Sequence, residues 1–332
     1  MLFARRYETS TYLGGGGFGS VWQATDQRQA QEVALKLFKP GNHPSFAFRE
    51  AQALTALGGP NVLRVHNADV YQDVPYIATE LAALGTTADR VSDGRGVRPD
   101  LAILWTRHML QGLAVCHAAG LLHRDVKPAN VFLRREDLAQ LGDFGLVEPL
   151  GHHGSTPVAG TPVYLPPEAY LNNEMTVASD IYMAGLTLWF LLTGDHPFSR
   201  LSLIDLPAAV TRGVTVRIRD VAPHVPRPVA LVAERAVAVD PSQRFEGSGE
   251  MNSALARTQY GTLWMEVVPD AGVVRQWANP ERGLVVRLTQ VNARRFLVDT
   301  RHARSGNRVR PHCEQLAQGQ VAVFLRRVFD AY

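Results

Sequence analysis

The chain has 332 residues, of which 46% are hydrophobic and 20% are charged, and its formal net charge is +3. This balance excludes a disordered chain, and the length suits a two-lobed fold of roughly 250 residues with a small additional domain. The longest apolar stretches, such as 182–192, are shorter than the roughly 20 residues of a membrane helix, and residues 1–10 lack the apolar core of a signal peptide. We therefore expect a cytoplasmic protein without a membrane segment.

Basic residues and cysteines are unevenly distributed. Residues 257–332 contain twelve arginines and six acidic residues, a net charge of +6, which leaves −3 for residues 1–256. Cys116 and Cys313 lie far apart in the sequence, which excludes a disulfide framework and a thiolate metal site. Of the 34 basic residues only three are lysine. A lysine kept in such a chain indicates a position that needs a compact point charge.

The first third of the chain predicts a small antiparallel sheet. Residues 8–38 have the pattern of a strand, a glycine-rich turn and two further strands, and 62–65 and 76–79 predict additional strands. Residues 46–57 place apolar side chains at helical spacing before Gly58-Gly59-Pro60. We expect one helix on a mostly β lobe.

From Asp100 onward the pattern becomes helical, after a hinge near residues 81–85. The expected helices are 101–118, 179–192, 229–239 and 250–258. Residues 261–332 return to β character, with segments at 263–268, 284–288, 295–298 and 321–329 that alternate or run apolar. We predict a separate small β-rich domain there.

Residues 13–21 form a glycine-rich run, Leu-Gly-Gly-Gly-Gly-Phe-Gly-Ser-Val. Glycines suit a hairpin that lies flat over phosphate groups, because no side chain holds the backbone N–H groups away from the oxygens. Taken alone, the run is more often a glycine turn without a ligand. A dinucleotide fold would need a helix next, whereas residues 21–24 predict a strand.

Three further motifs follow in order, and they are Val33-Ala34-Leu35-Lys36, His123-Arg124-Asp125-Val126-Lys127-Pro128-Ala129-Asn130 and Asp143-Phe144-Gly145. With them the chain, over residues 8–256, resembles a eukaryotic-type (Hanks-type) serine/threonine protein kinase of the kind also found in bacteria. The resemblance implies an α+β bilobal fold with a β-rich N-lobe at 1–82 and an α-rich C-lobe at 83–258. A small basic β-rich accessory domain would follow at 261–332.

The resemblance also implies ATP and Mg²⁺ as cofactors and a protein substrate. The acceptor is expected to be Ser or Thr and not Tyr, because in this family a lysine at the position of Lys127 marks serine/threonine kinases. Asp125 would act as the base on the acceptor hydroxyl, with Lys127 beside the γ-phosphoryl group. Asn130 and Asp143 would hold Mg²⁺. The residues expected to bind ATP are Leu13, Gly14, Gly16, Phe18, Gly19, Val21, Ala34, Lys36, Glu50, Thr79, Glu80, Ala82 and Phe132. Taken singly, such polar residues are more often turn, cap or surface residues, and it is the joint pattern that favours catalysis.

The segment Gly160-Thr161-Pro162-Val163-Tyr164-Leu165-Pro166-Pro167-Glu168 resembles the end of a kinase activation loop. Structural roles are implied for Glu168, which would bind Arg244, and for Asp180, which would brace the catalytic loop. In kinases of this family, the arginine that corresponds to Arg124 usually binds a phosphate on the activation loop. The expected regulatory residues are Arg124, Ser155, Thr156 and Thr161. We predict autophosphorylation at Ser155 or Thr156, because Thr161 is expected to contact Asp125 and Lys127.

Three other functions remain open. A pseudokinase scaffold would lack part of the catalytic set, which this chain retains, and a small-molecule phosphotransferase usually lacks residues like 161–168. A nucleic-acid-associated regulator could use the arginines of the C-terminal domain, which are Arg294, Arg295, Arg301, Arg304, Arg308 and Arg310. Aromatic interleaving is limited to Phe296, which disfavours nucleic acid. The favoured interpretation of these arginines is a solvated basic face, or a surface that docks an acidic partner or the catalytic lobe itself.

Overall fold

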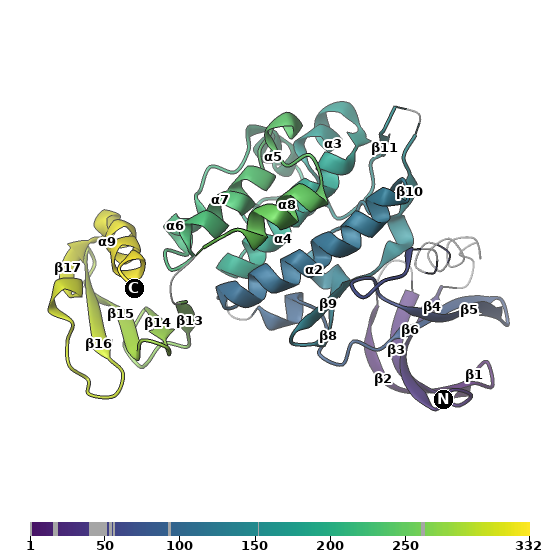
Figure 1. Cartoon of the computed structure of the whole chain (residues 1–332), viewed down its shortest axis with the longest axis horizontal. Helices are drawn as coiled ribbons and strands as arrows, with labels where there is room; N and C mark the ends of the chain where they lie inside the picture. The colour runs from purple at the N-terminus through teal and green to yellow at the C-terminus, as the bar shows by residue number, and fades with distance from the viewer. Residues whose placement is uncertain are drawn as a thin grey trace.

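The structure is a computed structural model. It describes residues 2–15, 19–39, 52, 55, 57–91, 94–151, 153–259 and 263–332. Figure 1 shows a curled sheet at the N-terminal end, a helical body in the middle, and a small sheet with one helix at the C-terminal end. Several sequence predictions lie outside the described residues, namely Gly16, Phe18, Glu50 and most of the helix expected at 46–57.

The N-lobe is built on one antiparallel sheet with the strand order β1-β2-β3-β4-β6-β5. Its strands are β1 (Leu2–Phe3), β2 (Tyr7–Gly15), β3 (Gly19–Asp26), β4 (Gln31–Phe38), β5 (Val65–Tyr71) and β6 (Val74–Glu80). The strands expected within 8–38 and at 76–79 are confirmed. The strand expected at 62–65 begins only at Val65, because Val62 forms an isolated bridge with Leu141 of the C-lobe instead.

The C-lobe is helical, and its helices bury one large apolar core. They are α2 (Pro99–Ala118), α3 (Pro167–Asn172), α4 (Val177–Thr193), α5 (Leu206–Arg212), α6 (Ile218–Val221), α7 (Arg227–Ala236) and α8 (Ser248–Ala256). The four helices expected here match α2, α4, α7 and α8. Helix α4 begins where Ser179 Oγ accepts a hydrogen bond from the backbone N of Thr176 (2.9 Å), and it ends at Gly194, whose φ of 79° suits glycine.

Short elements between the helices position the catalytic loop and the segment after it. The strands are β7 (Leu121–Leu122), β8 (Val131–Arg135), β9 (Leu138–Leu141), β10 (Glu148–Pro149), β11 (Thr156–Pro157) and β12 (Glu174–Met175). The 3₁₀ turns of the C-lobe are η1 (Ala88–Arg90), η2 (Pro128–Asn130), η3 (Phe144–Leu146), η4 (Pro162–Tyr164) and η5 (Pro241–Gln243), and η6 (Arg310–His312) lies in the C-terminal domain. Pairing of β10 with β7 and of β11 with β12 ties both ends of residues 146–157 to the C-lobe.

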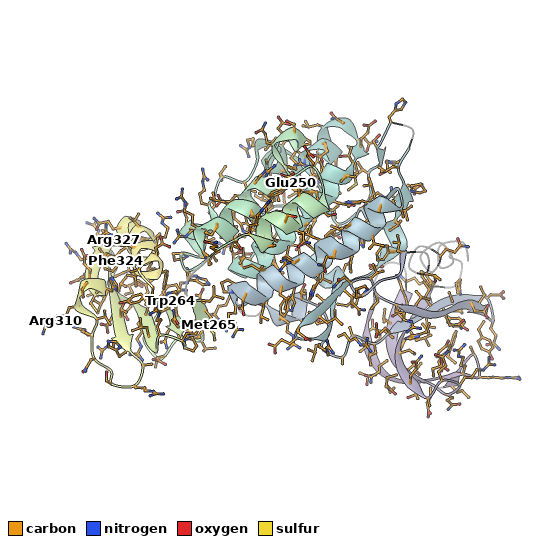
Figure 2. The ribbon with its side chains drawn as sticks, in the orientation of Figure 1. Glu250, Trp264, Met265, Arg310, Phe324 and Arg327 are labelled. Carbon is orange, nitrogen blue, oxygen red and sulfur yellow. The ribbon has the colours of Figure 1, made fainter. Side chains whose placement is uncertain are left out.

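The C-terminal domain is an antiparallel sheet with the order β13-β14-β15-β16-β17 and one helix. Its elements are β13 (Met265–Val267), β14 (Arg275–Asn279), β15 (Leu284–Asn292), β16 (Arg295–His302), β17 (Glu314–Ala317) and α9 (Gln318–Asp330). The domain has its own apolar core, separate from that of the C-lobe. Figure 2 shows Trp264 on its side toward the C-lobe and Arg310 on the opposite side.

The β character expected at 321–329 is wrong, because these residues form most of α9. The apolar side chains at 321, 324, 325, 328 and 329 recur at the spacing of one helix face, and they pack on the sheet. Strand β14 was not expected from the sequence. None of the helices in the described ranges combines the length and apolar character needed to cross a membrane.

Candidate active site

Lys36 and Asp143 meet across the cleft between the two lobes. Lys36 comes from the middle of β4 and Asp143 follows β9, and Lys36 Nζ lies 3.0 Å from Asp143 Oδ1. Burial alone would raise the pKa of Asp143, but the charge and hydrogen bond of Lys36 outweigh it and lower the pKa. The backbone of Asp143 is left-handed, with φ at 57°, a conformation that is uncommon for residues other than glycine. Asp143 is therefore held ionised in a constrained position.

Asp125 is the centre of a hydrogen-bonded cluster in the catalytic loop. Its Oδ1 accepts from the backbone N (3.0 Å) and Oγ1 (2.7 Å) of Thr161. Its Oδ2 accepts from Lys127 Nζ (2.7 Å) and from Asn130 Nδ2 (3.0 Å). Lys127 Nζ also donates to Thr161 Oγ1 at 2.7 Å. The contacts expected of Thr161 with Asp125 and Lys127 are thus present in the structure.

Asn130 and Asp143 offer the oxygen atoms that suit Mg²⁺. Asn130 Nδ2 donates to both the carbonyl and the carboxylate of Asp125, which leaves the amide oxygen as the acceptor available to a ligand. The backbone carbonyl of Asn130 accepts from the N of Gly142, so the two ligand candidates are joined through one backbone hydrogen bond. Within the described ranges, no three His, Cys, Asp or Glu side chains gather into a metal cluster. An ion here would need phosphate oxygens as well, which is typical of Mg²⁺.

Asp180 holds the backbone of the catalytic loop. Its carboxylate accepts from the backbone N of His123 (2.9 Å) and of Arg124 (2.9 Å), and it lies 2.8 Å from His117 Nε2. Burial would raise the pKa of Asp180, but hydrogen bonds and nearby histidines lower it. Arg124 has a left-handed backbone with φ at 66°. An anchored backbone is needed to keep that conformation.

The His123 ring links the loop to the residues around Asp143. His123 Nε2 lies 3.1 Å from the carbonyl of Gly142, and its ring packs edge-on against Phe144 with centroids 4.8 Å apart. Burial lowers the pKa of His123, which favours the neutral ring. At Gly142 a Cβ atom would come within 3.0 Å of the rings and methyl groups of Phe132 and Leu63. The glycine therefore permits close packing directly before Asp143.

The Arg124 guanidinium connects both ends of the expected activation loop. Its Nε donates to the carbonyl of Leu146 (2.7 Å), Nη1 donates to the carbonyl of Pro157 (3.0 Å), and Nη2 lies 3.1 Å from Glu148 Oε2. Desolvation lowers the pKa of Arg124, while Glu148 acts against that shift. The Arg124 side chain is nearly buried, so its guanidinium charge needs an anionic partner to offset the cost of desolvation, and Glu148 provides one.

Glu168 and Arg244 form a bidentate ion pair beneath this segment. Arg244 Nη1 and Nη2 lie 2.8 Å and 2.7 Å from the two carboxylate oxygens of Glu168, and both side chains are buried. Ser179 Oγ donates to the same carboxylate at 2.8 Å. This is the pairing expected from the sequence. It fixes α3, and with it the end of the segment that begins at Thr161.

The residues expected to surround adenine lie on β3, β4, β6 and just after β6. Ala34 and Thr79 are register partners, and Thr79 Oγ1 donates to the carbonyls of Ala34 (3.5 Å) and Glu80 (3.4 Å). The backbone N of Glu80 donates to Arg64, whereas that of Ala82 makes no hydrogen bond within the described part of the chain. The backbone N–H of Ala82 is thus available to the edge of a base, as expected for this hinge.

The other described residues that were expected to bind ATP lie in strands β2, β3 and β8. Leu13 and Gly14 lie in β2, where Gly14 has φ at 153°, and Val21 pairs with Lys36 across β3 and β4. Phe132 lies in β8.

Two contributors to the site were missed in the sequence. His117 supports Asp180, and Glu148 supports Arg124. His117 and Glu148 act through contacts with residues 63 and 24 positions away, which no local pattern records.

The family profile described as protein kinase domain matches residues 7–255. Among known proteins, the probable serine/threonine-protein kinase of Streptomyces coelicolor is 34% identical over 74% of this chain and 39% of its own length. The kinase PknB of Mycolicibacterium smegmatis is 31% identical over 77% and 43%. PrkC of Bacillus subtilis is 29% identical over 75% and 40%. The chain thus spans less than half the length of these relatives, and its C-terminal domain lies outside the family match.

Proposed function

Because the chain belongs to the protein kinase family, and within it to the Hanks-type serine/threonine kinases of bacteria, we propose that it transfers the γ-phosphoryl group of ATP to Ser/Thr hydroxyls of protein substrates. The observation that carries this proposal is the 3.0 Å contact between Lys36 and Asp143, which joins residues 107 positions apart at one cleft. Membership of the family implies ATP as the donor and Mg²⁺ as its usual companion.

Lys36 and Asp143 position the nucleotide. The charges of Lys36 and Asp143 are paired with each other, so both side chains lie at the place where we propose that the phosphates bind. Lys36 would pair with the α and β phosphates as a compact cation. The resemblance implies that an ion pair with Glu50, which lies outside the described residues, would hold Lys36 in place.

Asn130 and Asp143 would hold Mg²⁺, whose charge would screen the phosphate oxygens during transfer. The Asn130 amide is oriented for this by Asp125, which accepts both hydrogens available from Nδ2. This arrangement makes Asp125 responsible for one ligand as well as for the acceptor hydroxyl. Substitution of Asp125 should therefore affect the ion site too.

Asp125 orients the acceptor hydroxyl and takes its proton. The hydroxyl oxygen forms a bond with the γ-phosphorus, the bond from that phosphorus to the β,γ-bridging oxygen breaks, and ADP leaves. Lys127, bonded to Asp125 and to Thr161, stabilises the negative charge of the moving phosphoryl group. Thr161 anchors the segment that would bind the substrate chain beside Asp125.

The other functions are less well supported. A pseudokinase scaffold would not require Lys36, Asp125, Asn130 and Asp143 together in one cleft, and all four are present. A small-molecule phosphotransferase would not require the Glu168 and Arg244 pair below residues 161–168. A nucleic-acid-associated role for the C-terminal domain has only its arginines in its favour.

A phosphoryl-transfer assay with radiolabelled ATP and Mg²⁺ tests the proposal. It is run on the purified protein alone and with the proteins of a cell lysate as substrates. Asp125→Asn keeps the shape of the side chain but cannot take a proton, and labelling should fall by about 10²- to 10⁴-fold. Asp137→Asn, at an exposed ion pair with Arg135, is the matched control. Equal labelling by wild type and Asp125→Asn, or no transfer by wild type, would contradict the proposal.

We also propose autophosphorylation at Ser155 or Thr156. Ser155 is partly exposed, whereas Thr156 is 4% exposed and paired in β11, so its modification requires local opening of β11 and β12. Mass spectrometry of active protein should find phosphate on this segment. An unmodified segment, together with full activity of the Ser155→Ala/Thr156→Ala variant, would exclude this regulation.

A further inference from the structure

Within the described part of the chain, the C-terminal domain forms hydrogen bonds and ion pairs with α6 and the loop that follows it. In Figure 1 the domain lies beside α6, on the side of the C-lobe away from the N-lobe. Both α9 and β14 contribute contacts. The nucleotide cleft is therefore left uncovered by this domain.

Two neighbouring residues of α6 with opposite charges each bind an opposite charge on α9. Arg219 Nη2 lies 2.5 Å from Asp330 Oδ1, and Asp220 is bonded to Arg326 Nη1. Arg326 and Asp330 are four positions apart, so they lie on the same face of α9. A shifted or reversed docking would bring like charges together, so these pairs select one orientation.

A third arginine binds the end of α6. Arg275 of β14 donates from Nη1 to the carbonyl of Val221 at 2.8 Å, and its other nitrogens lie 2.6 Å from the two oxygens of Glu266. The carbonyl at the end of α6 is thus satisfied by a side chain of the other domain. Glu266 fixes the direction of the guanidinium.

His224 supplies the buried centre of the contact. It is 4% exposed, and its ring lies 6.4 Å from Trp277 and 6.2 Å from Phe329, measured between centroids. Phe329 packs in turn on Trp264 at 5.1 Å. A side chain of the C-lobe is thus enclosed by the aromatic core of the C-terminal domain, as expected for a specific interface with a buried anchor.

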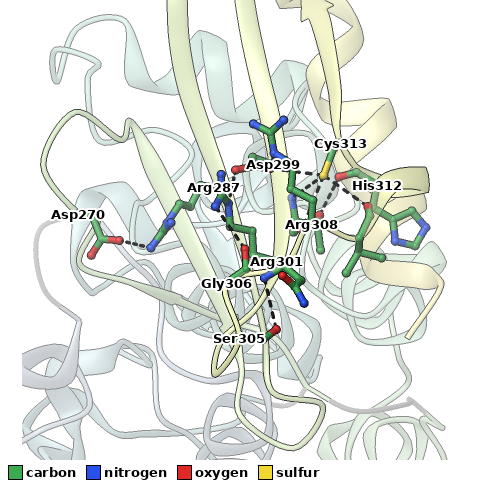
Figure 3. Close-up of polar contacts among 12 residues, drawn as sticks. Asp270, Arg287, Asp299, Arg301, Ser305, Gly306, Arg308, His312 and Cys313 are labelled. Carbon is green, nitrogen blue, oxygen red and sulfur yellow. Dashed lines mark hydrogen bonds and ion pairs between the residues drawn. The ribbon is translucent and has the colours of Figure 1, made fainter.

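The arginine cluster singled out in the sequence does not make this contact. Two of its members, Arg301 and Arg308, lie 2.6 Å and 3.0 Å from the same carboxylate, that of Asp299. Arg287, which lies outside the cluster, is bonded to Asp270, and Figure 3 shows both groups of contacts. These arginines therefore have their carboxylate partners inside the domain. Arg310 lies on the outer side (Figure 2).

We propose that residues 218–224 are an intramolecular docking site whose partner is the chain's own C-terminal domain, held in one orientation by the two crossed ion pairs and by His224. The domain is then a fixed extension of the C-lobe and does not block the nucleotide cleft. The proposal does not depend on catalysis, because every residue in it lies outside the active site.

Charge reversal in the full-length chain tests the proposal by hydrogen-exchange mass spectrometry of residues 218–225 and 324–330. Arg219→Asp and Asp330→Arg should each speed exchange in both segments by about tenfold, and the double variant should restore slow exchange. Asp220→Arg with Arg326→Asp provides a second, independent pair. Arg327→Glu, next to Arg326 on α9 and without a contact to the C-lobe among the described residues, is the matched control.

Restoration in either double variant supports the docking site. Unchanged exchange in all single reversals, or equally fast exchange in both double variants, overturns it. Phosphoryl transfer to a generic substrate by each variant reports whether the kinase lobes are folded. This activity should stay within about twofold of wild type, because no substituted residue touches the cleft.

Discussion

Glu148 lies 3.1 Å from the guanidinium of Arg124, through Oε2 and Nη2, and so provides a carboxylate at the residue expected to bind a loop phosphate. Two carbonyls complete the contacts of the same guanidinium, one from each end of the segment 146–157. A phosphate on Ser155 or Thr156 would have to compete with Glu148 for Arg124. Glu148 and the phosphate are thus two alternative anions for one cation.

The first prediction concerns this competition. Glu148→Gln should lower kcat of the unphosphorylated protein by roughly tenfold, because Arg124 loses a charge-assisted hydrogen bond worth about 1.5–3 kcal/mol. Phosphorylation of residues 146–157 should restore the activity of Glu148→Gln. Incubation with ATP should not restore it in a variant that also carries Ser155→Ala and Thr156→Ala. Steady-state kinetics after phosphatase treatment, and again after incubation with ATP, measure both effects. Full activity of the dephosphorylated variant would contradict the role of Glu148.

The second prediction concerns the buried pair of Glu168 and Arg244. Removing one partner leaves an uncompensated buried charge, so Arg244→Met should lower the free energy of unfolding by about 3–5 kcal/mol. Arg135→Met breaks an ion pair whose two side chains are 67% and 72% exposed, and should cost less than about 1 kcal/mol. Urea denaturation of both variants makes the comparison. Similar losses in the two would show that burial does not determine the strength of the pair.

The third prediction is a pH dependence at the docking site. Burial, with Arg275 and Arg219 nearby, lowers the pKa of His224 from 6.5 to about 3. Between pH 3 and pH 6.5 the unfolded chain therefore binds more protons at this residue than the folded chain does. The free energy of unfolding should fall as the pH is lowered through this range, by up to about 1.4 kcal/mol per pH unit. Asp330 and Glu266 are the carboxylates that bind these two arginines.

His224→Phe isolates this effect from the carboxylates that titrate in the same range. His224 Nδ1 has no hydrogen-bond partner within the described residues, so a phenyl ring should be accepted at no loss near pH 7. Thermal unfolding of both proteins from pH 7 to pH 4 should show a smaller loss for the variant. Parallel curves would mean that the ring does not resist protonation.

The fourth prediction concerns the glycine-rich hairpin. At Gly19 a Cβ atom would lie 2.0 Å from the carbonyl oxygen of Leu37, so Gly19→Ala must displace β3 from β4 and should raise KM for ATP several-fold. Gly249→Ala is the control, because a Cβ there meets nothing within 4 Å and α8 should gain up to about 1 kcal/mol from the better helix former. An unchanged KM in Gly19→Ala would show that the strand pair tolerates the shift.

Much of this protein was determined by local sequence. The strands within 8–38 and the helices α2, α4, α7 and α8 follow from apolar periodicity and from turn and cap residues, which act over a few positions. The proposed catalytic residues were identified by the resemblance of the glycine-rich run and three further motifs, in order and at fixed spacing, to those of protein kinases. Such motifs are local, so they can be recognised without knowing the fold.

Other features were decided only by tertiary structure. Residues 321–329 are apolar enough for a strand, and packing of their helical face on the sheet decided for α9. Val62 bridges Leu141 and not a neighbouring N-lobe strand, and Glu148 binds Arg124 because the chain folds back along β7. Arg219 meets Asp330 across 111 positions. Contacts of this kind depend on which surfaces the whole chain brings together, and no local pattern encodes them.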